Sequence, residues 1–161
     1  MKQTQSKGIT IMTLIITVVV LLILASVTIY TGGNIINNAK LQTIQTNLML
    51  VQAKCKTIGE ESSFKSDESI LVGSKLADSS IKSEIQNKLG IKESSQGYDK
   101  WYILNQDNLN TLGIEGIKLT QNDFYLVNYE TEEVATFKGY KDSTGNTYYL
   151  LSEIQNLGLT E

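Results

Sequence analysis

An uninterrupted apolar run near the N-terminus dominates the hydropathy pattern of the chain. Residues 9–30 carry no charge, and no charged residue occurs between Lys7 and Lys40. A helix of about 20 apolar residues is long enough to cross the hydrocarbon core of a bilayer. Tyr30 closes the run, at a position where an aromatic ring suits the membrane interface. The pattern therefore predicts a membrane-spanning helix over residues 9–31.

The short segment before the run, residues 1–8, is a basic leader. It contains Lys2 and Lys7 and no acidic residue. Since positive charge is retained on the cytoplasmic side, we expect a single-pass protein with a cytoplasmic N-terminus and its bulk outside the cell. A cleaved secretory signal is the first alternative, but apolar residues continue past the small residues Ala25 and Ser26. A plain signal anchor is the second alternative.

The helical pattern resumes after Gly32 and Gly33, which we expect to mark a bend, an unwound turn or a flexible joint. Apolar residues then recur with a strict 3-4-3-4-3 spacing, which predicts an amphipathic helix over 34–58 as the second half of the same long helix. This seam, which we expect to pack on a globular head, consists of Leu41, Ile44, Leu48, Val51, Cys55 and Ile58. A coiled coil is the competing interpretation, but the seam covers fewer than three heptads. We expect Gly59 to end the helix and 60–69 to form a loop.

Residues 59–161 are predicted to form a small α+β head with an antiparallel sheet. Ten of the twelve aromatic residues lie between Tyr98 and Tyr149, which favours strands there. The predicted strands are 101–104, 124–129, 134–137 and 147–150, with a hairpin turn at 130–133. The predicted short helices are one capped near Asp78 or Ser79 and ended by Gly90, one over 107–112 capped by Asn105, and one through Ile154 and Leu157.

The composition excludes several classes of function. The chain of 161 residues has no His, no Arg and a single Cys, Cys55. An internal disulfide, a Cys/His zinc site and a Ser-His-acid triad are therefore ruled out. Without the leader, 12 lysines face 17 acidic residues, which argues against nucleic-acid binding. We expect no enzyme activity and no cofactor.

Four features of the head invite a functional interpretation, and each also has a plain structural one. Asp142 to Asn146 could bind calcium, although a simple turn is favoured because the spacing is not that of an EF-hand. Glu130, Glu132 and Glu133 could act as an acid/base pair, although exposed charges at a hairpin tip are favoured. The aromatic residues are expected in the sheet core rather than in a ligand platform. Cys55 could pair between chains, but its place in the seam argues against this.

The boundary between leader and apolar run carries a family resemblance. Lys7, Gly8 and the run GITIMTLIITVVVLLILASVTI resemble the N-terminal signal of type IV prepilin-like proteins of low-GC Gram-positive bacteria. The resemblance implies a pilin-like fold, cleavage after Gly8 by a prepilin peptidase and N-methylation of Ile9. It further implies a minor pilin or pseudopilin, in a filament of a type IV pilus or a type II secretion-like system. Its partners would be other pilin-like subunits and an assembly platform in the membrane.

One position departs from the pattern of that family. Most pilins have Glu at the fifth residue of the mature chain, and Thr13 stands there in this sequence. Threonine can donate a hydrogen bond but cannot neutralise the terminal amine of a neighbouring subunit. This difference argues against an ordinary major pilin and leaves a minor pilin or a pseudopilin.

Threonines are repeated along one face of the predicted membrane helix. The residues that fall on this face are Thr10, Thr13, Thr17, Thr28 and Thr31. They form either a polar stripe that packs between the helices of neighbouring subunits or a set of hydroxyls that bond back to their own helix. The alternative to the whole filament hypothesis is a membrane-anchored extracellular binding protein that does not assemble.

Overall fold

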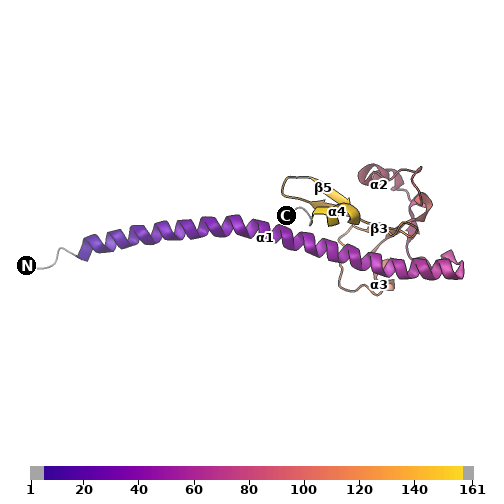
Figure 1. Cartoon of the computed structure of the whole chain (residues 1–161), viewed down its shortest axis with the longest axis horizontal. Helices are drawn as coiled ribbons and strands as arrows, with labels where there is room; N and C mark the ends of the chain where they lie inside the picture. The colour runs from indigo at the N-terminus through magenta and orange to yellow at the C-terminus, as the bar shows by residue number, and fades with distance from the viewer. Residues whose placement is uncertain (1–5, 158–161) are drawn as a thin grey trace, which may run out of the picture. The chain divides into compact units, whose positions relative to one another are not determined.

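The structure is a computed structural model in which the backbone is described for residues 6–157. Side chains are described for residues 13–22 and 37–157. The chain divides into two compact units, residues 1–40 and 41–161. The larger unit, called the head below, is an α+β domain in which a long helix packs against a five-stranded antiparallel sheet (Figure 1).

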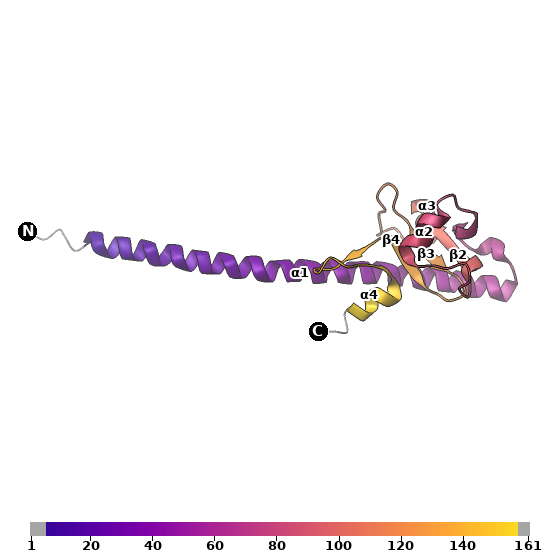
Figure 2. The same cartoon turned by 90° about the horizontal axis from the view of Figure 1, so that it is seen from above.

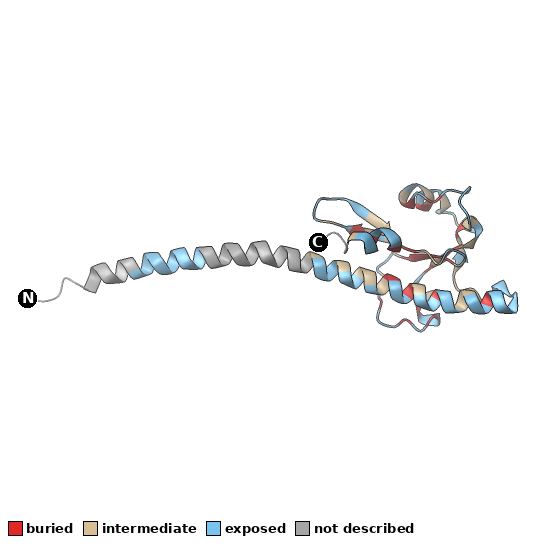
Figure 3. Cartoon of the chain, in the orientation of Figure 1, coloured by how far each residue is buried: buried red, intermediate tan, exposed pale blue. Residues whose placement is uncertain are grey.

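Helix α1 (Ser6–Lys65) begins in the small unit and ends in the head. Within the head, the predicted seam is confirmed, because Leu48, Val51 and Cys55 are fully buried. Leu41, Ile44 and Ile58 pack against the same cluster and are partly buried. Figure 3 shows buried and exposed residues alternating along this part of α1.

The predicted end of the helix at Gly59 is wrong. The helix continues to Lys65, and Ser62 extends the 3-4 spacing of the seam as a buried residue. Gly59 has a packing role instead, because a Cβ atom at this position would lie 3.3 Å from Cδ1 of Tyr129. Residues 60–65, which were expected in a loop, therefore form the last turns of α1.

The sheet has the order β1-β2-β3-β4-β5, and every neighbouring pair is antiparallel. The strands are β1 (Ser74–Lys75), β2 (Trp101–Leu104), β3 (Tyr125–Asn128), β4 (Val134–Lys141) and β5 (Thr147–Leu150). Since each strand pairs only with its neighbours in the chain, the sheet is a meander. The predictions for β2 and β5 are confirmed residue by residue, and the predicted hairpin of β3 and β4 is present.

Three short helices complete the head: α2 (Lys82–Leu89), α3 (Gln106–Thr111) and α4 (Leu151–Leu157). Gly90 ends α2 with a φ of 69° and Gly113 follows α3 with a φ of 70°, as expected for glycine after a helix. Asn105 caps α3 in a capping box with Asn108. Single-turn 3-10 helices occupy Glu68–Ile70, Leu76–Asp78 and Tyr98–Lys100.

The sheet separates two hydrophobic clusters. One face, with Tyr102, Leu104, Tyr125 and Val127, packs against the seam of α1 and against Leu109 and Ile154. The opposite face, with Trp101, Leu126 and Ala135, packs against Ile85 and Leu89 of α2. Figures 1 and 2 show the sheet lying along the C-terminal part of α1. The aromatic residues of the strands serve mainly as core, as expected.

Two parts of the sheet were not anticipated. Strand β1 has only two residues, which is too short for any periodicity to reveal. Strand β4 runs four residues beyond the prediction, through a bulge between Ala135 and Tyr140. Gly139 lies in the bulge with a φ of 74°, and a Cβ there would lie 2.7 Å from side-chain atoms of both Thr147 and Tyr149.

The predicted membrane span, 9–31, coincides with described side chains only at residues 13–22. Among the described residues, no helix is both long and apolar enough to cross a membrane. The backbone at Gly32 and Gly33 is helical, so the expected unwound turn is not seen.

Candidate functional site

The residues predicted to be processed belong to the start of α1. Lys7, Gly8 and Ile9 have helical backbone, and their side chains lie outside the described residues. The side chains of Thr10 and Thr28 also lie outside them. Thr17 is described, and its hydroxyl donates to the carbonyl oxygen of Leu14 at 2.8 Å. Thr17 thus bonds back to its own helix, and Thr13 has an exposed side chain on the same helix.

The described part of the small unit presents apolar side chains in every direction around α1. Leu14, Leu21 and Leu22 are 63–65% exposed, and the valines at 18, 19 and 20 are close to half exposed. An apolar surface of this kind is stable in water only if something covers it. This segment is therefore the first candidate for a functional surface.

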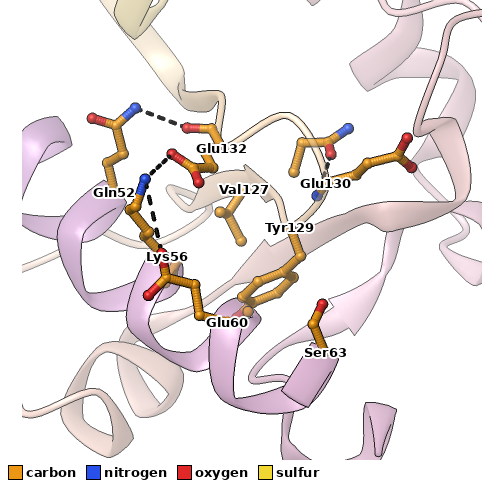
Figure 4. Close-up of a pocket in the computed structure, with 11 residues that line it drawn as sticks. Gln52, Lys56, Glu60, Ser63, Val127, Tyr129, Glu130 and Glu132 are labelled. Carbon is orange, nitrogen blue, oxygen red and sulfur yellow. Dashed lines mark hydrogen bonds and ion pairs between the residues drawn. The ribbon is translucent and has the colours of Figure 1, made fainter. Parts of the chain in front are cut away.

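The second candidate is a groove in the head between the end of α1 and the turn after β3. Its volume is about 400 Å³, and Figure 4 shows the side chains that line it. Gln52, Lys56, Glu60 and Ser63 come from α1, whereas Tyr129, Glu130 and Glu132 come from the opposite wall. A second groove of about 400 Å³ adjoins it and shares Gly59, Ser63, Tyr129 and Glu130.

The turn after β3 is fixed to α1 by polar contacts. The Nζ of Lys56 lies 2.8 Å from Oε2 of Glu132 and 4.0 Å from Oε1 of Glu60. Gln52 donates to the carbonyl oxygen of Glu132 at 2.8 Å. The contact with Glu132 raises the pKa of Lys56, mainly through the hydrogen bond. Both partners are largely exposed, so this ion pair orients the turn more than it stabilises the fold.

The three glutamates of the turn do not form the acid/base pair considered above. Glu132 contacts Lys56, Glu130 accepts a hydrogen bond from Gln96, and Glu133 accepts one from the backbone of Ser152. Each carboxylate is thus directed to a different element of the head. The buried Asn128 organises the turn, because its Oδ1 accepts from the backbone N–H groups of Glu130 and Thr131.

Cys55 lies at the floor of the groove and is only 1% exposed. Burial raises the pKa of its thiol to about 11, opposed by a side-chain hydrogen bond with Tyr129. A buried thiol with a raised pKa is a weak nucleophile. The structure thus places Cys55 in the core, and the alternative of a disulfide between chains would require the head to open.

Tyr129 connects the groove with the segment before β1. Its hydroxyl accepts from the backbone N–H of Val72 at 3.2 Å and donates to the carbonyl oxygen of Val72 at 2.9 Å. Burial, followed by the neighbouring Cys55, raises the pKa of this phenol strongly. The residue was not singled out in the sequence, because a tyrosine at the end of a strand gives no sign of such a partner.

The segment Asp142 to Asn146 forms a turn between β4 and β5. Oδ1 of Asp142 accepts from the backbone N–H groups of Thr144 and Asn146 and from the hydroxyl of Thr144. The hydrogen bond from Thr144 is the largest cause that lowers the pKa of Asp142. The carboxylate that would have bound calcium is thus used by the turn itself. Among the described residues, no three His, Cys, Asp or Glu side chains lie close enough to hold a metal ion.

Comparison of the chain with models of known protein families, with curated proteins and with solved structures found no match. A functional conclusion therefore depends on the sequence pattern at the N-terminus and on the two candidate surfaces.

Proposed function

We propose that the chain is a structural subunit, a minor pilin or pseudopilin, of a type IV pilus or type II secretion-like filament. In this proposal a prepilin peptidase cuts after Gly8 and the new N-terminal Ile9 is methylated. The head remains outside the cell, and α1 leaves the membrane to pack among the helices of other subunits. The role is mechanical and involves no catalysis.

The observation that carries the proposal is the division of α1 into two kinds of surface. In the head, one face of α1 is covered by the sheet through the seam from Leu41 to Ile58. From Leu14 to Leu22, by contrast, the apolar side chains are exposed. A helix that serves first as a membrane anchor and then as part of a helical bundle needs such an apolar surface in both environments.

The fold of the head and the polar contacts of its groove support the same proposal. A long helix packed on an antiparallel meander is the arrangement that the pilin resemblance implies. The polar residues of the groove are used to hold the β3–β4 turn against α1. Open, non-closing contacts between such subunits would generate a helical filament.

Mass spectrometry of the chain co-expressed with a prepilin peptidase tests the proposal. We expect loss of residues 1–8 and addition of one methyl group to the amine of Ile9. The matched control is Gly8→Leu, which we expect to keep the leader, because a bulky side chain replaces the glycine at the cleavage position. An intact leader in the unsubstituted chain would instead favour a membrane-anchored binding protein that does not assemble.

A further inference from the structure

A second apolar face runs along α1 in the head, on the side opposite the seam. Its residues are spaced 4-3-4-3-4 and are all exposed: Thr46, Leu50, Ala53, Thr57, Glu60 and Phe64. Met49 lies beside them. We call this set the outer stripe. Of the four large apolar side chains that are exposed in the described residues of the head, three belong to it, namely Met49, Leu50 and Phe64.

The exposure of the outer stripe is high for apolar side chains. Phe64 is 92% exposed, Met49 51% and Leu50 40%. The two threonines add methyl groups, because their hydroxyls donate to the carbonyl oxygens of Gln42 and Ala53 within the helix. Helix α1 therefore carries apolar side chains on two opposite faces. Glu60 interrupts the outer one, and only the inner one is covered by the head.

We propose that the outer stripe pairs with the outer stripe of a second copy of this chain, in a parallel and in-register helix pair. The parallel direction rests on the proposed function, because both copies would enter the same membrane through their N-terminal halves. The 3-4 spacing is that of a helix–helix seam. The stripe extends over roughly 27 Å, and among the described helices only α1 is long enough to match it.

The charges that flank the outer stripe favour the in-register pairing. In a parallel pair, a residue at one edge of the seam lies beside the residue roughly five positions later on the partner. Lys56 of one copy would then lie beside Glu61 of the other. A shift of one heptad would instead bring Lys56 beside Lys54 of the other copy. These two positive charges would repel each other, which disfavours the shifted register.

The existing partners of these charges leave them available. Lys56 pairs with Glu132, and the two side chains are 48% and 42% exposed. Glu61 pairs with Lys65 in an exposed contact one turn away. Surface pairs of this kind contribute little and are easily shared with a new partner.

Glu60 weakens the proposed pairing. It lies within the outer stripe, so two copies in register would bring their Glu60 carboxylates together. Like charges brought together at an interface oppose binding. We therefore expect pairing only where an anchor raises the local concentration, as in a membrane.

Oxidative cross-linking of the full chain in membranes tests the inference. Leu50→Cys and Phe64→Cys should each give disulfide-linked dimers, at least fivefold more than the unsubstituted chain, whose Cys55 is buried. Ser143→Cys, an exposed position in the β4–β5 turn, is the matched control for random collision. Glu60→Leu, added to Leu50→Cys, should raise the dimer fraction further.

Two results would overturn the pairing: no dimer above background with Leu50→Cys and Phe64→Cys, or equal dimer with Ser143→Cys. An antiparallel pair would give the first of these results, because neither single variant would then meet its own copy. Cleavage of the leader is measured on the same samples. A cut leader without cross-links refutes the pairing alone, whereas cross-links with an intact leader refute only the filament subunit.

Discussion

Gly59 and Tyr129 meet at the point where α1 crosses the end of β3, and a Cβ on Gly59 would lie 3.3 Å from Cδ1 of the ring. The absence of a side chain lets the phenol approach the helix backbone. This approach brings the hydroxyl of Tyr129 to the carbonyl oxygen of Val72. The rings of Tyr129 and Tyr102 meet edge to face, with their centroids 5.1 Å apart.

A larger residue at position 59 should separate α1 from the sheet. We expect Gly59→Leu to lower the free energy of unfolding by about 1–3 kcal/mol, as is usual for overpacking. Gly59→Ala should change it by less than the ~1 kcal/mol gain usual for this substitution in a helix, because the contact is already tight. Urea denaturation measures both. A full gain with alanine would contradict the packing role of Gly59.

The hydroxyl of Tyr129 should contribute more to the stability of the head than the hydroxyl of Tyr98. Tyr129→Phe leaves the N–H and the carbonyl of Val72 without their partner, which we expect to cost about 1–3 kcal/mol. The matched control is Tyr98→Phe, whose hydroxyl accepts one bond from the side chain of Gln86. Chemical denaturation should rank the two variants in this order, and equal losses would refute the expectation.

Alkaline pH should destabilise the head through Cys55. The pKa of the thiol is about 11 in the folded chain and about 8.5 in an unfolded one. The unfolded chain therefore releases this proton first, so stability falls as pH rises from about 8.5 towards 11. The loss should reach at most roughly 3 kcal/mol. It is measured as the difference in pH dependence between the unsubstituted chain and Cys55→Ala, and identical slopes would contradict it.

The cap at the start of α3 should stabilise the head through its two hydrogen bonds. Oδ1 of Asn105 accepts from the backbone of Asn108, and Oδ1 of Asn108 accepts from the backbone of Asn105, both at 3.0 Å. Asn105→Ala should lower stability by about 1 kcal/mol. Asn110→Ala, which removes only an exposed contact with Gln106, should change it little. Thermal melting distinguishes the two.

The sequence predicted those elements in which one local signal is sufficient. The seam of α1 follows from its spacing, and β2 follows from a compact apolar run between polar segments. The cap at Asn105 and the ends at Gly90 and Gly113 follow from residue types with strong positional preferences.

Two of the failures involve glycines whose role depends on distant residues. Gly59 carries the same local signal as Gly90, but it contacts a ring 70 positions later and lies inside a helix. Gly139 permits a bulge that depends on Thr147 and Tyr149 of the next strand. The groove was missed for a similar reason, since its walls come from segments about 70 residues apart.

A hydrogen bond joins α1 to α4, near the two ends of the head's sequence. Gln45 donates to the carbonyl oxygen of Ile154, 109 positions later in the chain. The strands pair with their chain neighbours and can assemble as they are synthesised. The seam of α1 has no such local partner, because Leu48 and Val51 are buried in one cluster with Tyr102 and Val127, so the helix depends on β2 and β3 for its cover.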